Sequence, residues 1–544
     1  MISSGSSSSA GKAWPHAVVV ALASVLVLHA RAIHYVGDDG MITLRYVRNL
    51  IEGKGLVFNE GERVEGYTNF LWVILVAAID RIVHARLDIE ARALGLGCAV
   101  ATQIVLTRLS WKVSGNRGLL SFLAPVLLAS STAYVAWAEA MLEGPLFSLA
   151  VVTAVAAYAA YLDDRRSLGW TMAVLSLATL TRPEGLLLLF VTVAFESGRR
   201  CYDHDARRPS WLKPLAIFAL GVVPHLAWRA WYYGALVPNT FHAKVGFSLD
   251  TLVRGFQYVR QFAVSGPGPL LVLPIALVLR RPIDARLTFA ASLCVAYLGY
   301  VVIIGGDGLM FGRFITYVLP LLCLLAQEGL RTLIEHLAQP RPPWARAIGM
   351  PATTVVALLL VVGLSWNGAL ALLRPKWPWF QDSSSKLHFP GDGQEHSFPF
   401  FDQYFTARVA RAGVWLDHHA PPDALIAANP AGIAYSLRMP VLDMLGLNDP
   451  VIARSRPPSI GRGRAGHERG DGRYVLSRKP EYILLGNVAV LPFPLDDEGI
   501  HARIYLSSER QIWDEASFHR DYERVVVRLE DRGPFQYFTF YRRR

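Results

Sequence analysis

Long apolar stretches separated by short polar ones make up the first two thirds of the chain. An α-helix needs about 20 apolar residues to cross a bilayer core of about 30 Å. Stretches of roughly this length lie at 16–36, 68–83, 91–110, 119–137, 145–162, 168–196, 212–232, 268–281, 286–305, 311–330 and 350–373. The pattern predicts a polytopic α-helical membrane protein with about eleven membrane segments.

Beyond residue 374 the apolar runs shorten to strand length and charged residues become frequent. Strands are expected at 424–428, 441–443, 482–485, 522–530 and 535–542, the last two antiparallel, with a helix after the turn at 429–432. The chain is therefore expected to divide into a membrane domain over 1–373, with a first external loop over 37–67, and a soluble α/β domain over 374–544.

Composition supports the membrane assignment, because 53% of the residues are hydrophobic and only 18% are charged, against about 25% charged in soluble proteins. The net charge of +11 is not accompanied by a nucleic-acid-binding module, so anionic lipid headgroups are the simpler partner. None of the four cysteines lies in the α/β domain, which argues against a disulfide framework there.

Basic residues cluster in the loops near 199–213, 280–286 and 331–346, and the positive-inside rule places such loops in the cytoplasm. The α/β domain is then external. A plain count of segments would also leave the basic residues near 108–117 and 165–166 outside. A re-entrant early segment, together with a break of 168–196 at Arg182, would remove this conflict and keep the α/β domain external.

The strongest candidate for chemistry is a pair of neighbouring carboxylates, Asp38 and Asp39, directly after the first apolar stretch. Ionisable side chains at a membrane boundary are costly and typically serve chemistry or ion binding. The alternative is a solvated turn that ends the first span. The following residues, 41–50, have apolar positions at helical spacing and predict a short amphipathic helix in the external interface.

Further polar residues lie at or near the ends of predicted spans. They are Glu65 and Tyr67 in the first loop, Asn69 at the start of the second span, Glu143 after the fourth, Arg182 and Glu184 within the sixth, His242 and Lys244 in an outward segment, Asp307 before the tenth and Arg313 at its start. Each alone could be a helix break or cap, but together they predict an external cavity of carboxylates and cations. Lysine and arginine in such a cavity suit a phosphate group.

A glycine- and arginine-rich segment at 455–473 carries His467. Two interpretations stay open: a loop that covers the active site, or, slightly favoured, a solvated loop. The turn at 429–432 lacks the glycine spacing of a dinucleotide fingerprint.

Several motifs together resemble the mycobacterial terminal β-(1→2)-arabinofuranosyltransferases of the GT-C glycosyltransferase superfamily. They are Asp38-Asp39-Gly40, Gly55-Leu56-Val57-Phe58-Asn59, Gly61-Glu62-Arg63-Val64-Glu65, Arg182-Pro183-Glu184, Tyr233-Gly234 with Val237-Pro238 and Lys244, Gly305-Gly306-Asp307 with Gly312-Arg313, and Gly446-Leu447 with Asp449-Pro450. The resemblance covers most of the chain in the same order. This chain is shorter, and its run at 65–69 differs from the mycobacterial pattern, so the family is better supported than the sugar.

The resemblance implies an enzyme of the bacterial cytoplasmic membrane that transfers a sugar, with arabinofuranose as the first candidate, from a polyprenyl-phosphate donor to a cell-envelope glycan or glycolipid. It also implies that Asp38 or Asp39 activates the acceptor hydroxyl as a base, and that cations such as Arg182, Lys244 and Arg313 hold the phosphate. No cofactor is implied with certainty, and a divalent cation stays open. Two alternatives from other classes are a membrane transporter with an external carboxylate site and a non-catalytic envelope-assembly protein.

Overall fold

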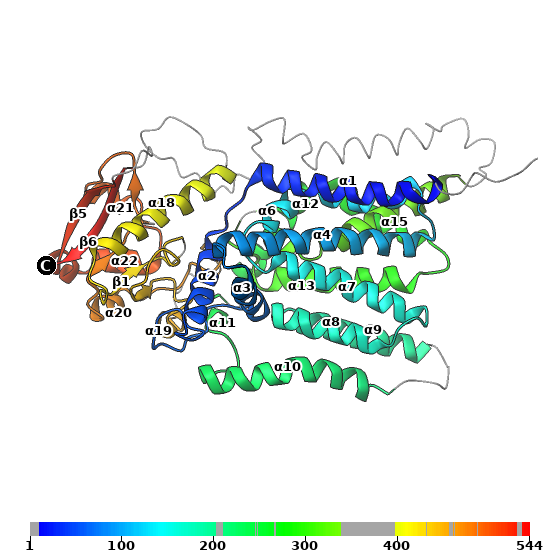
Figure 1. Cartoon of the computed structure of the whole chain (residues 1–544), viewed down its shortest axis with the longest axis horizontal. Helices are drawn as coiled ribbons and strands as arrows, with labels where there is room; N and C mark the ends of the chain where they lie inside the picture. The colour runs from blue at the N-terminus through cyan, green and yellow to red at the C-terminus, as the bar shows by residue number, and fades with distance from the viewer. Residues whose placement is uncertain are drawn as a thin grey trace, which may run out of the picture.

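The computed structural model describes residues 10–202, 210–244, 246, 248–265, 268–309, 311–338, 398–430, 432–455, 461, 463–486, 488–529 and 536–544. The predicted span at 350–373 and the predicted domain boundary at 373/374 lie outside these residues. Along the longest axis of the molecule, a bundle of helices lies beside a smaller α/β part (Figure 1).

The helical part consists of α-helices and two 3-10 helices, most of which the apolar stretches form. These are α1 (Ala10–Ile33), α2 (Asp38–Ile51), α3 (Phe70–Val83), α4 (Leu87–Ser114), η1 (Leu119–Phe122), α5 (Leu123–Ser130), α6 (Thr132–Ala138), α7 (Gly144–Leu162), α8 (Leu168–Thr181), α9 (Gly185–Tyr202), α10 (Leu212–Tyr233), α11 (Asn239–Lys244), α12 (Leu249–Ser265), η2 (Gly268–Leu279), α13 (Ala285–Ile303), α14 (Arg313–Thr316) and α15 (Leu319–Ala338).

By length and composition, four helices among the described residues are suited to cross a membrane. They are Trp14–Ile33, Leu87–Ser114, Gly144–Leu162 and Ala285–Ile303. A fifth span results if Leu119–Ser130 and Thr132–Ala138, which meet at an angle of 61°, count as one bent pair. The membrane character is thus supported, but the described residues do not confirm the predicted count of about eleven. Several apolar stretches instead form shorter helices, such as α3 and η2.

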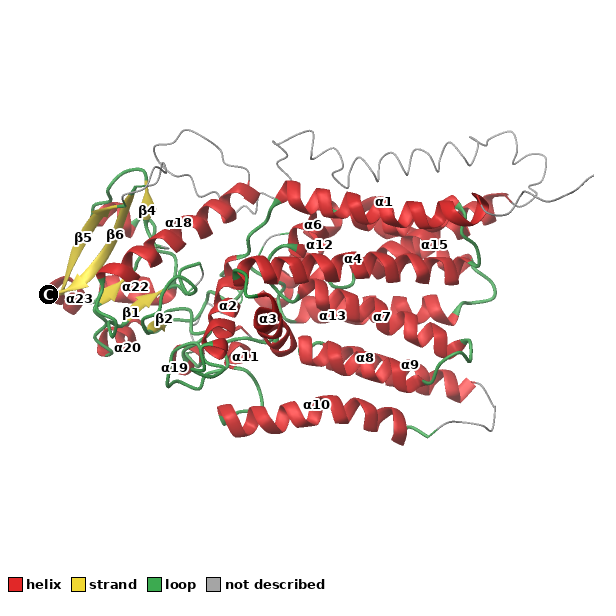
Figure 2. Ribbon diagram, viewed as in Figure 1, coloured by secondary structure: helices red, strands yellow, loops and turns green. Residues whose placement is uncertain are grey.

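The predicted break in 168–196 is confirmed, because α8 ends at Thr181 and α9 begins at Gly185. The early segment at 68–83 forms α3, which is seen nearly end-on while α4, α7 and α10 are seen lengthwise (Figure 2). This orientation fits the prediction that one early segment does not cross the bundle.

Ion pairs show which loops share one end of the bundle. Asp163 pairs with Lys112 (3.0 Å) and with Arg286 (3.7 Å), and Arg280 pairs with Glu328 (3.0 Å). The basic residues after α4 and α7 therefore lie at the same end as the basic 280–286 loop. The plain count, which put them on opposite sides, is wrong, and the count with a re-entrant early segment agrees with these contacts.

The α/β part holds a six-stranded sheet in which strand pairing follows the order β2-β1-β3-β6-β4, with β5 also paired to β6. The strands are β1 (Ile426–Ala428), β2 (Val441–Asp443), β3 (Tyr482–Ile483), β4 (Val490–Leu491), β5 (Tyr522–Arg528) and β6 (Tyr537–Arg543). The helices are α18 (Phe398–His419), α19 (Pro450–Ala453), α20 (Gly472–Ser477), α21 (Asp497–His501), α22 (Ser507–Asp514) and α23 (Ala516–Asp521). The predicted antiparallel pair, β5 and β6, is confirmed.

The helix expected after the turn at 429–432 is wrong, because residues 432–436 form turns. Arginines of α2 donate hydrogen bonds to backbone carbonyls within and just after these turns. Arg45 donates to the carbonyls of Ala434, Leu437 and Met439 at 2.8–3.1 Å, so these groups contribute to the contact between the two parts of the chain.

Helix α2 differs from the predicted interfacial helix in its surroundings. Its spacing does produce a helix, but Leu44, Arg45 and Tyr46 are at most 2% exposed. Besides the three carbonyls, Arg45 donates to the Phe58 carbonyl (2.7 Å) and the Asn59 amide oxygen (3.1 Å). Helix α2 is therefore enclosed between the first loop and the α/β part.

We expect Arg45→Met to destabilise the protein, because the substitution leaves several buried oxygens without a donor. Leaving even one such group unsatisfied costs about 1–3 kcal/mol. The midpoint of thermal unfolding in detergent should fall by several degrees, whereas Arg520→Met, at an exposed guanidinium that pairs with Asp521, should leave it unchanged. Equal midpoints for Arg45→Met and the unsubstituted protein would show that this contact does not hold the two parts together.

Candidate active site

Asp38 and Asp39 form the first turn of α2 rather than a solvated turn. The Asp39 N–H donates to Asp38 Oδ1 at 2.8 Å, and carboxylates at a helix N-terminus are favoured by the helix dipole. The turn lies close against the loop before α7, because a Cβ added at Gly40 would approach the Ala140 carbonyl oxygen to 2.9 Å. Glycine at position 40 therefore permits the close approach that places the two carboxylates.

Two predicted cations flank Asp39. Arg313 Nη1 lies 3.4 Å from Asp39 Oδ2, and Lys244 Nζ lies 3.9 Å from the same oxygen. Arg313 also pairs with Asp307 at 2.7 Å. The structure thus brings together predicted site residues from α2, α11 and α14 and from the loop before α14.

The glycine- and arginine-rich segment of the α/β part reaches the same place. Arg464 Nε donates to the Gly308 carbonyl at 3.0 Å, and a Cβ added at Gly466 would lie 3.5 Å from the Lys244 side chain. His467 follows directly and interacts electrostatically with Asp39. These contacts favour the interpretation of 464–467 as part of a loop that lies against the site, although Arg464 itself is exposed.

The surroundings separate the two carboxylates electrostatically. Burial and the neighbouring charge of Asp39 raise the pKa of Asp38 to about 6, although Arg464 and Arg313 oppose this shift. Burial also disfavours the charged form of Asp39, but Lys244 and Arg313 hold its pKa below the ordinary value. Burial and the charge of Arg464 lower the pKa of His467 to about 3. Near neutral pH, Asp39 is thus a fixed anion, Asp38 is the stronger base and His467 is neutral.

A second cluster surrounds Arg182. Its guanidinium contacts Glu143 Oε1 closely and pairs with Glu184 at 2.7 Å, and Asn69 donates to Glu143 at 2.8 Å. The Phe314 ring connects this cluster to the first one, because the guanidinium carbons of Arg182 and Arg313 lie 5.3 Å and 5.0 Å from its centroid. Two carboxylates already pair with Arg182, so its predicted role at a phosphate stays a prediction.

Glu65 and Tyr67 belong to a third set of contacts. Glu65 is 3% exposed and pairs with Arg229 of α10 at 2.8 Å. The Tyr67 hydroxyl lies 3.2 Å from that of Tyr233. A Cβ added at Gly66, between them, would approach Asn448 Oδ1 to 1.9 Å. These contacts join the first loop to α10 and to the α/β part, and substrate binding by Glu65 and Tyr67 stays a prediction.

His242 makes a ring contact with Phe241, with centroids 5.7 Å apart. Within the part of the chain that the structure describes, no hydrogen bond or ion pair joins it to Asp39. Its predicted role also stays a prediction.

Two residues of the site were not predicted individually. Arg464 lies in the segment whose glycine and arginine content was noted, so composition gave a signal. Arg254 of α12 binds both the Asp307 loop and the α/β part. The sequence around Arg254 contains no signal that indicates this role.

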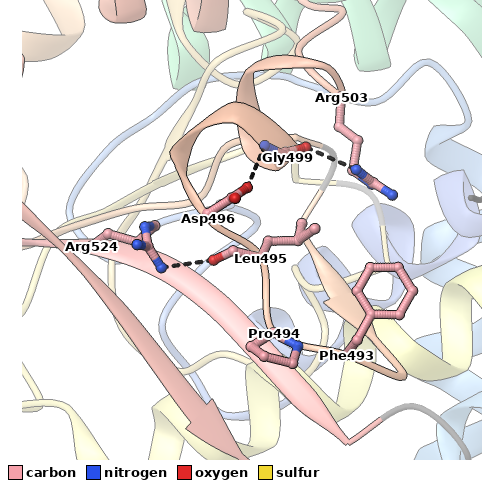
Figure 3. A pocket seen from close by; sticks show the side chains of 7 residues that line it. All are labelled: Phe493, Pro494, Leu495, Asp496, Gly499, Arg503 and Arg524. Carbon is pink, nitrogen blue, oxygen red and sulfur yellow. Dashed lines mark hydrogen bonds between the residues drawn. The ribbon is translucent and has the colours of Figure 1, made fainter.

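A pocket in the α/β part lies elsewhere. It has a volume of about 480 Å³ and is lined by Phe493, Pro494, Leu495, Asp496, Gly499, Arg503 and Arg524 of the α/β part (Figure 3). None of the predicted site residues lines it, so we place the candidate site at the charge cluster. Among the described residues, no group of three or more His, Cys, Asp or Glu side chains is arranged to hold a metal ion.

Comparisons with known proteins agree with the predicted resemblance. Residues 401–541 match the model of a domain of unknown function, DUF8728. The terminal beta-(1->2)-arabinofuranosyltransferase of Mycobacterium tuberculosis is 28% identical over an alignment of 453 residues, and the match covers 73% of this chain and 67% of the relative. The corresponding protein of Corynebacterium glutamicum is 27% identical over an alignment of 360 residues, and the match covers 54% of this chain and 47% of the relative. The alignment thus spans about half the length of this second relative.

Two solved structures share the fold. ArnT from Cupriavidus metallidurans, bound to undecaprenyl phosphate, matches with a TM-score of 0.52 and 12% identity over 79% of this chain and 86% of ArnT. The Archaeoglobus fulgidus oligosaccharyltransferase in the apo form matches with a TM-score of 0.52 and 11% identity, over 87% of this chain and 69% of that protein.

These matches confirm the predicted resemblance: the sequence is similar to that of two named glycosyltransferases, and the fold is shared with ArnT and the oligosaccharyltransferase, which are membrane glycosyltransferases of GT-C type. The particular proteins to which its sequence is similar are the terminal beta-(1->2)-arabinofuranosyltransferases.

We expect Arg182→Gln to reduce stability whether or not Arg182 also contacts a substrate. Removing the cation leaves Glu143 and Glu184 buried together without compensation, and breaking a buried pair in this way costs about 3–5 kcal/mol. The thermal midpoint in detergent should therefore fall, whereas Arg542→Gln, at an exposed pair with Glu523, should not change it. An unchanged midpoint for Arg182→Gln would indicate that the cation is not needed to hold the two carboxylates and is available to a ligand.

Proposed function

We propose that the chain transfers a sugar from a polyprenyl-phosphate donor to a cell-envelope glycan or glycolipid on the external face of the bacterial cytoplasmic membrane. The observation that carries this proposal is the Asp38–Asp39 pair with Arg313 and Lys244 beside it. Such a cluster combines a base for a hydroxyl with cations for a phosphate. The ArnT match supports the donor class, since that protein is bound to undecaprenyl phosphate.

Asp38 is the proposed base, because its pKa of about 6 is closer to neutral pH than that of an ordinary aspartate. It accepts the proton of the acceptor hydroxyl as the acceptor oxygen forms a bond to the anomeric carbon. The bond from that carbon to the phosphate oxygen breaks, and polyprenyl phosphate leaves. Protonation of Asp38 removes one negative charge while the leaving phosphate gains one, so the net charge of the site is unchanged.

Asp39 has a different proposed role. As a fixed carboxylate paired with Arg313 and Lys244, it keeps these cations beside the base. The cations in turn stabilise the charge that develops on the leaving phosphate. Arabinofuranose is the first donor sugar to test, because it is the sugar in the names of the similar proteins.

The direct test of this function is to incubate the purified protein with a panel of polyprenyl-phosphate sugars and an envelope glycan acceptor, and to analyse the products. We expect a new glycosidic linkage with at least one donor. Uptake of a solute into proteoliposomes with no product from any donor would instead support the transporter alternative.

We also propose that residues 1–373 form the membrane domain and that residues 374–544 lie outside the cytoplasm, on the same side as Asp38. A cysteine at the exposed position Ser477, in a background without Cys201, should then react with a membrane-impermeant maleimide in intact spheroplasts. Reaction only after lysis would contradict this orientation.

Asp38→Asn, which is nearly isosteric, should remove the base and leave the fold intact. A positioned general base typically contributes about 10²–10⁴-fold to the rate, so the transfer rate should fall by at least about 10²-fold. Asp39→Asn should also impair transfer, through the arrangement of its cations. Asp417→Asn, at a carboxylate on α18 near the exposed Arg438, serves as a control. Wild-type turnover in both site variants would exclude this loop from the chemistry.

The transfer rate should depend on pH through Asp38. Because the pKa of Asp38 is raised to about 6, the active carboxylate form is lost as the pH falls below that value. The rate should therefore decline on acidification with a midpoint near pH 6, over a range in which the thermal midpoint of the protein, measured in parallel, shows that the protein stays folded. A rate that is flat down to about pH 4, the ordinary range of an aspartate, would contradict the assignment of Asp38 as the base.

A further inference from the structure

Arg254 connects the loop that carries Asp307 to the α/β part. Its Nε donates to the Gly305 carbonyl at 2.9 Å, and its Nη1 donates to the Gly463 carbonyl at 3.0 Å and to Glu468 Oε1 at 2.7 Å. A single guanidinium on α12 thus holds two segments that lie more than 150 residues apart in the chain.

Glu468 shapes the segment from within. It is 8% exposed, and its Oε1 also accepts hydrogen bonds from the backbone N–H groups of Gly461 (2.7 Å) and Gly463 (3.2 Å). Burying a carboxylate is costly unless it is paired and hydrogen-bonded. Glu468 is paired with Arg254 and hydrogen-bonded to the backbone N–H groups of Gly461 and Gly463. These contacts form only when the segment folds back on itself as it does here.

The turn places Arg464 at the site. Arg464 Nε donates to the carbonyl of Gly308, the residue after Asp307. A Cβ added at Gly308 would approach the Ala465 carbonyl oxygen to 2.8 Å, so backbone from the two parts is in close contact here. The charge of Arg464 acts on both Asp38 and Asp39, since it lowers the pKa of each.

We propose that the α/β part supplies a substrate-binding residue: Arg464 binds the phosphate of the polyprenyl-phosphate donor, and the Arg254–Glu468 ion pair positions it. The inference rests on the proposed function and adds a residue from a separate part of the chain to the phosphate site. A guanidinium suits this role because its planar array of N–H groups matches phosphate oxygens. In this arrangement Lys244 and Arg313 approach the phosphate from the helical part and Arg464 approaches it from the α/β part.

The test compares the binding of undecaprenyl phosphate with that of undecaprenol, which lacks the phosphate, to the purified full-length protein in detergent micelles. Arg464→Gln should weaken binding of undecaprenyl phosphate about tenfold or more, the range expected for a lost hydrogen bond to a charged group. Binding of undecaprenol should not change. Arg464→Lys, which keeps the charge, should restore part of the lost affinity.

The positioning pair gives a second, independent readout. Glu468→Gln and Arg254→Gln should each weaken binding of undecaprenyl phosphate. When either is combined with Arg464→Gln, the double variant should bind no more weakly than Arg464→Gln alone. Additive losses would mean that the pair does not act through Arg464. The matched control is Arg473→Gln, at an exposed arginine that ends the segment and pairs with Glu515. This variant should bind like the unsubstituted protein.

The possible outcomes separate this inference from the proposed function. Unchanged phosphate affinity in both Arg464 variants, with transfer still abolished in Asp38→Asn, would overturn the inference and leave the function standing. If the unsubstituted protein bound undecaprenol and undecaprenyl phosphate equally, the donor assignment and the inference would both be wrong. Equal losses of both ligands in Arg464→Gln would indicate a structural role for Arg464 and would also overturn the inference.

Discussion

Two neighbouring carboxylates at the start of a largely buried helix are costly unless cations lie close to them. Asp38 and Asp39 are in this position, and the cations near them come from α11, from α14 and from the α/β part. No short stretch of sequence contains this set. The fold must therefore bring these separate segments to the first turn of α2. The packing at this end of the bundle follows from that requirement.

The α/β part contributes to this packing in several places. Arg45 binds carbonyls on both sides of the contact, and Gly66 leaves room for Asn448. Arg254 joins the Asp307 loop to the segment that carries Arg464. Because these contacts converge around α2, the α/β part is a component of the candidate site. A change in its position would alter the charges around Asp38.

The sequence predicted those features that depend on local pattern. The break at Arg182 follows from a polar interruption of an apolar stretch, and β5 and β6 follow from alternation. Charged side chains at span ends are costly and typically serve a function. This cost made four residues recognisable as site candidates: Asp38, Asp39, Lys244 and Arg313.

Other features depend on partners far away in the chain. Glu65 has the same local signal as Asp39, but Arg229 neutralises it in a separate contact. The turns at 432–436 replace an expected helix where arginines of α2 bind the carbonyls that follow. The role of Arg254 depends on segments before and after it that only the fold brings together. Local periodicity contains no information on such pairings, which explains why Arg254 and the buried setting of α2 were not predicted.

The central claim is that the phosphate of a polyprenyl donor binds beside the Asp38–Asp39 pair. A cryo-electron microscopy structure of the protein with undecaprenyl phosphate tests it most directly. The claim predicts phosphate density within hydrogen-bonding distance of Arg313 or Lys244, with the prenyl chain running along the bundle. Phosphate density at the opposite end of the bundle, near the ion pair of Arg280 and Glu328, would contradict it.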